Sequence, residues 1–168
     1  AIPRQAVAEV LIDKEKEDVF RRVLLQAEEE IKAEFATKDP DFGITTVYRG
    51  GEWEGCVDEV GTAYVAAYLI ALPDGVQAMS ADVPGLVETS LNLGILKYDR
   101  EAQEIRCEFS VRSCIESAKK AVLEKVAAIT ELAGGTSRVS GDYPGWAYRV
   151  DSPLRDKMVA VYEEMYGK

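Results

Sequence analysis

The chain has 168 residues, of which 47% are hydrophobic and 30% charged, a balance typical of one ordinary globular domain with a real core. Its formal net charge of −10 opposes binding to nucleic acid or to an anionic membrane, because phosphate groups would be repelled. It contains no histidine, which excludes imidazole-based acid–base catalysis, Ser/His and Cys/His nucleophile pairs, and every zinc site that needs imidazole.

The cysteines and the apolar stretches indicate the cellular environment in which the chain is expected to work. Cys56, Cys107 and Cys114 are odd in number and form no CxxC pair, which favours a reduced, cytoplasmic setting with buried thiols. The most apolar stretch, residues 63–72, is only half of a bilayer span and is better explained as a buried helix. The opening AIPRQAVAEV lacks the regions of a signal peptide and reads as a chain entered in its middle.

The first half of the chain is predicted to contain two strands and two helices. Alternating apolar side chains predict a strand over residues 4–13, and β-branched residues predict a short strand over 43–49. Apolar residues at helical spacing predict helices over 14–37 and 57–72. The glycine-rich segment 49–55 lacks the spacing of a phosphate-binding loop.

The second half is predicted to contain strands over 87–98 and 103–112, a helix over 115–133, a strand over 136–140 and a last helix from 153 onward. The first two strands form the clearest hairpin, joined by residues 99–102. Ser152 as N-cap and Pro153 at the first helical position begin the last helix.

This order of elements predicts an α+β fold, a two-layer open-faced sandwich in which a mainly antiparallel sheet carries its helices on one face. Residues 57–140 read α-β-β-α-β, which is related to the ferredoxin-like β-α-β-β-α-β unit. The second face of the sheet would then be uncovered.

The hairpin strands each have an apolar and a polar side. The apolar sides hold Val87, Thr89, Leu91, Leu93 and Ile95 on the first strand and Cys107, Phe109 and Val111 on the second. Arg112, Ser90 and Asn92 are therefore predicted to lie on the uncovered face. An arginine at the end of a strand there is either a solvated charge paired with Glu108 or a grip for an anion, and the pattern alone leaves both open.

Four stretches resemble the aminoacyl-histidine dipeptidases: AIPRQA (1–6), VETSLNLGILK (87–97), EIRCEFSVRSCIESAKK (104–120) and GDYPGW (141–146). These enzymes belong to the co-catalytic zinc metallopeptidases, with aminoacylases and carnosinases. The resemblance covers essentially the whole chain. It implies a cytoplasmic two-domain hydrolase whose zinc-binding catalytic domain carries an inserted lid domain, through which the enzyme also forms a homodimer.

The resemblance implies that residues 1–147 are the lid and dimerisation domain, and that 148–168 are a linker and the first helix of the returning catalytic segment. Two zinc ions would be held by the parent enzyme and none by this chain, which alone would be inactive. Arg112 would contact the terminal carboxylate of a dipeptide substrate or the developing oxyanion, a task that suits its planar fork of donors. Ser90 and Asn92 would orient a substrate amide or shape the dimer interface, the alternative being ordinary polar positions on a sheet.

The GDYPGW loop, with Tyr143, Pro144, Gly145 and Trp146, is interpreted as a hinge corner, with direct substrate contact as the alternative. The acidic groups 28–30 and 58–59 are expected to be solvated helix faces, because adjacent helix positions do not converge on one metal ion. A different class of function stays open: a stand-alone ferredoxin-like module that binds a small anion or serves regulation through the open sheet face.

Overall fold

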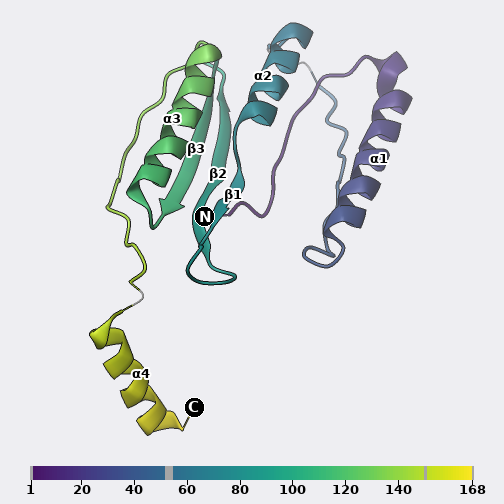
Figure 1. Ribbon diagram of the computed structural model, residues 1–168. Helices are drawn as coiled ribbons and strands as arrows, with labels where there is room; N and C mark the ends of the chain where they lie inside the picture. The colour runs from purple at the N-terminus through teal and green to yellow at the C-terminus, as the bar shows by residue number, and fades with distance from the viewer. Residues whose placement is uncertain (1, 52–54, 150, 168) are drawn as a thin grey trace. The chain divides into compact units, whose positions relative to one another are not determined.

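The computed structural model describes residues 2–51, 55–149 and 151–167. Its contacts divide the chain into two compact units, Ala6–Glu59 and Val60–Lys168 with Ala1–Gln5. In chain order the elements are η1 (Lys14–Lys16), α1 (Glu17–Phe35), α2 (Glu59–Ala71), β1 (Gly75–Met79), β2 (Val87–Asp99), β3 (Glu104–Ser113), α3 (Glu116–Leu132) and α4 (Pro153–Tyr166) (Figure 1). The predicted boundary at residue 147 is not addressed by this division and stays a prediction.

The three strands form one antiparallel sheet in the order β1-β2-β3, and α3 packs along β3 and β2 (Figure 1). Helix α2 is joined to α3 by a hydrogen bond of 2.9 Å between the hydroxyls of Tyr68 and Thr130. The predicted hairpin is confirmed, and the Asp99 carboxylate accepts from the backbone N–H groups of Glu101 and Ala102 in its connection. The predicted α+β class is likewise confirmed.

The core of this unit is small and centres on β2. Leu91 is only 1% exposed and Thr89 also 1%, while Val122 of α3 and Leu72 after α2 are buried in the same unit. The Thr89 hydroxyl is satisfied by the Ser113 hydroxyl at 2.8 Å, as a buried polar group needs. Along β3, exposed residues alternate with half-buried ones from Glu104 to Ser113, as the two-residue period of a strand requires.

One face assignment made from the sequence is wrong. Leu93 pairs with Phe109, but Ile95 pairs with Glu108, so Gly94 is an extra residue in the ladder, a β-bulge. Ile95 therefore lies on the open face with Glu108 and is 41% exposed, instead of sharing the covered face with Leu93. Simple alternation misses this because it assumes an uninterrupted ladder.

The strands predicted over residues 4–13, 43–49 and 136–140 are also wrong, because none of these described segments is in a strand. An alternating pattern predicts an extended backbone, but a strand also needs an edge to bond to, which local sequence does not specify. Strand β1 is missing from the prediction because it directly follows the turn at Pro73-Asp74 and has only five residues.

The helices agree with the prediction apart from their ends. The helix expected over 14–37 divides into η1 and α1, and the other predicted helices end within two residues of α2 and α3. For α4 the prediction of the N-cap is confirmed, since the Ser152 hydroxyl accepts from the backbone N–H of Arg155 at 3.4 Å. Among the described helices, none combines the length and the apolar character that a membrane crossing requires.

Candidate functional site

The open face of the sheet carries the residues singled out in the hairpin. Ser90 lies directly opposite Arg112, and Asn92 lies opposite Ser110. Residues directly opposite in an antiparallel pair point to the same face, with Cβ atoms about 4.5–5.5 Å apart. The register therefore brings Arg112, Ser90 and Asn92 onto one face, although their roles stay predictions.

The guanidinium of Arg112 is open to a ligand. The carboxylate expected to neutralise it in the alternative interpretation, Glu108, instead pairs with Arg106 at 3.0 Å. Arg112 is exposed, and its side chain forms no ion pair or hydrogen bond with any residue that the structure describes. Because an unpaired guanidinium retains its full set of donors, it can bind a carboxylate through two parallel hydrogen bonds.

The turn that follows Arg112 joins β3 to α3 and is held by several hydrogen bonds. The Ser113 hydroxyl bonds to Thr89, donates to the carbonyl of Ile115 at 2.9 Å and accepts from its N–H at 3.0 Å. The next residue, Cys114, donates its backbone N–H to the carbonyl of Glu88 at 3.2 Å. These bonds tie the end of β3 to β2 and to the start of α3.

A buried lysine then attaches the GDYPGW loop to this turn. Lys119 of α3 is 6% exposed, and its ammonium contacts the Asp142 carboxylate at 2.8 Å, the Tyr143 carbonyl at 2.8 Å and the Glu116 carboxylate at 3.0 Å. The Glu116 carboxylate also accepts from the N–H of Gly145 at 3.3 Å. We call these five groups the Lys119 clamp.

The other loop residues are more open. Tyr143 is 63% exposed and Trp146 is 89% exposed, and Pro144 is also exposed. The loop is therefore attached by the Lys119 clamp and by the backbone of Gly145 rather than by the indole of Trp146. The predicted hinge role of the loop stays a prediction.

Sequence reasoning did not single out Lys119, although a signal was available. Lys119 lies four residues after Ile115 and three before Val122, within the apolar stripe of α3. A lysine in such a stripe is either a break in the pattern or a buried cation, and a buried cation needs acidic partners. Asp142, in the loop, is the partner that the spacing of the helix alone cannot reveal.

Replacing Gly145 by alanine is expected to destabilise the unit by about 1–3 kcal/mol, because there is no room for a side chain. A methyl group there would lie 2.9 Å from the carbonyl oxygen of Ser113 and 3.0 Å from that of Cys114. Urea unfolding measures the change. Gly43→Ala is the matched control, since its methyl group would meet only Glu28 Oε1 at an ordinary 3.6 Å. Equal unfolding midpoints for the two variants would contradict the close packing at Gly145.

The Lys119 clamp also predicts a dependence of stability on pH. The pKa of Asp142 is lowered from its ordinary value of 3.8, chiefly by the hydrogen bond from Lys119. The pKa of Lys119 is raised from 10.5, chiefly by Asp142. The lowered pKa of Asp142 adds stability that is complete above its unfolded pKa and is lost as the pH falls through its folded pKa. The raised pKa of Lys119 adds stability that is complete below its unfolded pKa and is lost as the pH rises through its folded pKa. The clamp therefore stabilises the unit fully at pH values between the ordinary pKa of Asp142, 3.8, and that of Lys119, 10.5.

Accordingly, Asp142→Asn is expected to lower the urea midpoint at neutral pH, and the difference from the unchanged chain should shrink and vanish as the pH falls through the lowered pKa of Asp142. The control is Glu124→Gln, which removes an exposed partner of Lys120 and should change little at any pH. A difference for Asp142→Asn that persisted in strong acid would show that its effect does not arise from the ionised carboxylate.

The donor set of the chain does not fit the zinc ions that the resemblance implies. The sequence has no histidine, and no group of three or more cysteine, aspartate or glutamate side chains in the described ranges is arranged to hold a metal ion. The acidic residue Glu28 is instead paired with Lys32 at 2.6 Å, which lowers its pKa together with a backbone hydrogen bond from Ile44. Burial raises the pKa of the Cys107 thiol, so this cysteine is poorly suited to act as a thiolate ligand.

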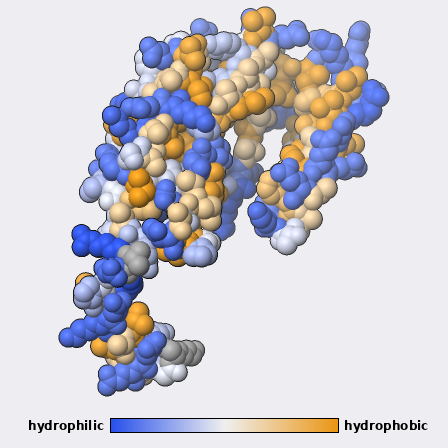
Figure 2. All heavy atoms as spheres, viewed as in Figure 1, coloured by the Kyte–Doolittle hydropathy of each residue, from blue (hydrophilic) through white to orange (hydrophobic). Residues whose placement is uncertain are grey.

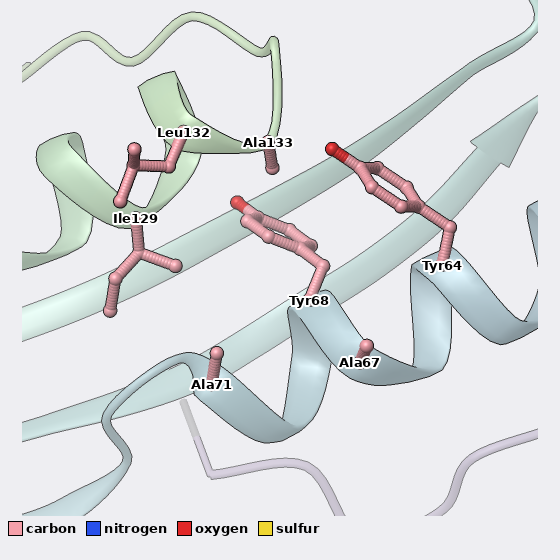
Figure 3. A pocket seen from close by; sticks show the side chains of 7 residues that line it. All are labelled: Tyr64, Ala67, Tyr68, Ala71, Ile129, Leu132 and Ala133. Atoms are coloured by element: carbon pink, nitrogen blue, oxygen red, sulfur yellow. The ribbon is translucent and has the colours of Figure 1, made fainter.

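A shallow apolar pocket of about 250 Å³ lies between α2 and α3 on the covered side of the unit (Figure 3). The side chains that line it are Tyr64, Ala67, Tyr68, Ala71, Ile129, Leu132 and Ala133. Figure 2 shows hydrophobic residues reaching the surface over α2 and over α4, where Leu154 is 72% and Met158 is 65% exposed. The pocket offers few polar groups to orient a ligand, so it is a weaker candidate site than the face with Arg112.

Comparison with known proteins confirms the resemblance drawn from the sequence. The chain is 29% identical over 168 residues to the cytosol non-specific dipeptidase of Escherichia coli (strain K12), covering all of this chain and 34% of that protein. The crystal structure of aminoacylhistidine dipeptidase from Vibrio alginolyticus matches with a TM-score of 0.78 and 30% identity, over 92% of this chain and 31% of that one. No family model matches.

The chain therefore is homologous to dipeptidases and spans about one third of the length of these relatives.

Proposed function

We propose that the chain is the lid and dimerisation domain of a zinc-dependent dipeptidase that hydrolyses Xaa-His-type dipeptides in the cytoplasm. The observation that carries this proposal is the homology itself, which extends over all of this chain but only about a third of each dipeptidase. The absence of histidine from the sequence supports it, because a zinc peptidase site would have to come from elsewhere in the protein.

In this proposal the chain binds and orients the substrate and does not break the peptide bond. Arg112 would donate two hydrogen bonds to the terminal carboxylate of the dipeptide or to the oxyanion that develops from the scissile carbonyl. Ser90, opposite Arg112, and Asn92 would orient a substrate amide or shape the interface between subunits. When bound elsewhere in the parent enzyme, zinc would supply an activated water.

The dimerisation role is supported by the edges of the sheet. β3 is an edge strand of ten residues, and no described strand pairs with its outer side. A strand edge of that length without a paired strand is a ready template for pairing with another chain. Sedimentation equilibrium of the chain should detect a homodimer, and a monomer at every concentration tested would contradict this part of the proposal alone.

The activity is tested on the intact protein that contains this chain. We expect it to hydrolyse Xaa-His dipeptides, to lose this activity on treatment with a zinc chelator and to regain it on addition of zinc, whereas the chain alone should hydrolyse nothing. An intact protein without dipeptidase activity would contradict the proposal. The alternative of a stand-alone binding module would gain if the reading frame around this chain encoded no further dipeptidase-like sequence.

A further inference from the structure

The Lys119 clamp joins parts of the unit that are distant in the sequence. The chain after α3 runs back along that helix toward its N-terminal end (Figure 1), and Asp142 and Tyr143 meet Lys119 there. An ammonium group has three N–H donors, and three oxygen acceptors lie within 3.0 Å of the Lys119 nitrogen. The charge is therefore fully satisfied although the side chain is buried.

The GDYPGW loop is attached directly beside the turn that follows Arg112. Gly145 packs so closely on the carbonyl groups of Ser113 and Cys114 that no side chain fits between them. These two residues directly follow Arg112 in the chain. The loop therefore packs against the turn at the end of β3 and restricts the position of its backbone.

Arg112 is thus supported from two directions. On the β2 side, the Thr89 and Glu88 bonds hold Ser113 and Cys114, and on the loop side the Lys119 clamp holds Gly145 against the same turn. An exposed arginine has a long, flexible side chain, so the direction of its Cα–Cβ bond decides which positions its guanidinium can reach. That direction is set by the backbone at the end of β3.

From this geometry we infer that Lys119 is a positioning residue for Arg112: through Asp142, Tyr143 and Gly145 it fixes the end of β3 from which the guanidinium reaches the substrate. The inference rests on the proposed function, since it assigns Arg112 a substrate. It assigns this role to a side chain whose ammonium contacts, in the part of the chain that the structure describes, belong to Glu116, Asp142 and Tyr143 and not to residues of the open face.

The first test uses the chain by itself and does not depend on any activity. Lys119→Met keeps a long apolar stem and removes the charge. We expect faster backbone amide exchange at 113–116 and at 143 and 145, with unchanged exchange in the middle of the β2–β3 ladder. Lys120→Met, an exposed neighbour paired with Glu124 at 3.6 Å, is the matched control and should change neither region. Unchanged exchange at 113–116 in Lys119→Met would overturn the inference.

The second test uses the intact dipeptidase and measures the link to Arg112. Lys119→Met should lower kcat/KM by about 10- to 100-fold, as small misplacements of a contact group do. In an Arg112→Ala background the same change should have little further effect, because the misplaced group is already absent. If the losses instead simply add, Lys119 acts through general stability and the inference is wrong.

Asp142→Asn is the second variant, in case Lys119→Met does not fold. It weakens the same clamp from the loop, where the Asp142 side chain is 57% exposed and nothing new is buried. It should show the same dependence on Arg112, and additivity would again overturn the inference. If Arg112→Ala itself had no effect on activity, the proposed function would fail, whereas the exchange experiment would still decide whether Lys119 holds the turn.

Discussion

Under the proposed function, replacing Arg112 by alanine in the intact protein is expected to lower kcat/KM by about 30- to 1000-fold, corresponding to a loss of about 2–4 kcal/mol of transition-state stabilisation. The reason is that the guanidinium is not committed to any described side chain, so its donors would be available to the substrate. Steady-state kinetics with a Xaa-His dipeptide gives the value. Arg112→Lys should recover only part of the loss, because an ammonium cannot form the two parallel hydrogen bonds of a guanidinium.

Arg106→Ala is the matched control for this experiment. Arg106 lies on the same strand and the same face as Arg112, but its guanidinium pairs with Glu108, and it lies opposite Lys97 at the far end of the hairpin. Removing an exposed ion pair of this kind changes energies by about 1 kcal/mol or less. An equal loss of activity in the two variants would mean that the net charge of the face matters and not a specific contact of Arg112.

Replacing Leu91 by alanine should have the largest effect on stability, about 2–5 kcal/mol, because it combines lost burial with a cavity that the surroundings fill only in part. Leu91 is 1% exposed and lies between Gly75 on β1 and Val111 on β3, at the centre of the three-stranded sheet. The core has few other fully buried side chains in the described ranges, so little is available to repack around the gap. Urea unfolding followed by circular dichroism measures the loss.

The control for Leu91 is the same substitution at Leu132, which is 87% exposed at the end of α3. Exposed positions of this kind usually change stability by no more than about 0.5 kcal/mol. Similar unfolding midpoints for Leu91→Ala and Leu132→Ala would show that the centre of the sheet is not packed as described.

The hairpin and its faces could be predicted from the sequence because the alternation of β3 is unbroken, and this pattern alone puts Arg112 on the side opposite to the core. The same reasoning failed where a strand depends on a partner, as at residues 136–140, because pairing is a property of two segments. It also failed at Ile95, since a bulge changes the faces without changing the composition of the strand.

For the candidate site, too, the residues set by strand alternation could be predicted and those set by long-range contacts could not. Arg112, Ser90 and Asn92 follow from alternation on two neighbouring strands, so their shared face can be predicted without the exact register of the pair. The Lys119 clamp could not be predicted, because the burial of Lys119 depends on Asp142, 23 residues later, and on a loop whose path no local pattern specifies. Long-range polar contacts of this type depend on the whole fold and leave no periodic signal in the sequence.

The bulge at Gly94 has a consequence for comparing this chain with its homologues. Leu93 and Ile95 pair with the consecutive residues Phe109 and Glu108, so a strand without Gly94 would place every other side chain on the face that it already occupies. The extra residue adds twist and bend to the backbone but carries no side chain of its own. A homologue that is one residue shorter in this hairpin should therefore be aligned with its gap at Gly94 and not at the turn around residue 101, so that residues 95–99 stay in the columns of the residues that pair with β3 in the same way.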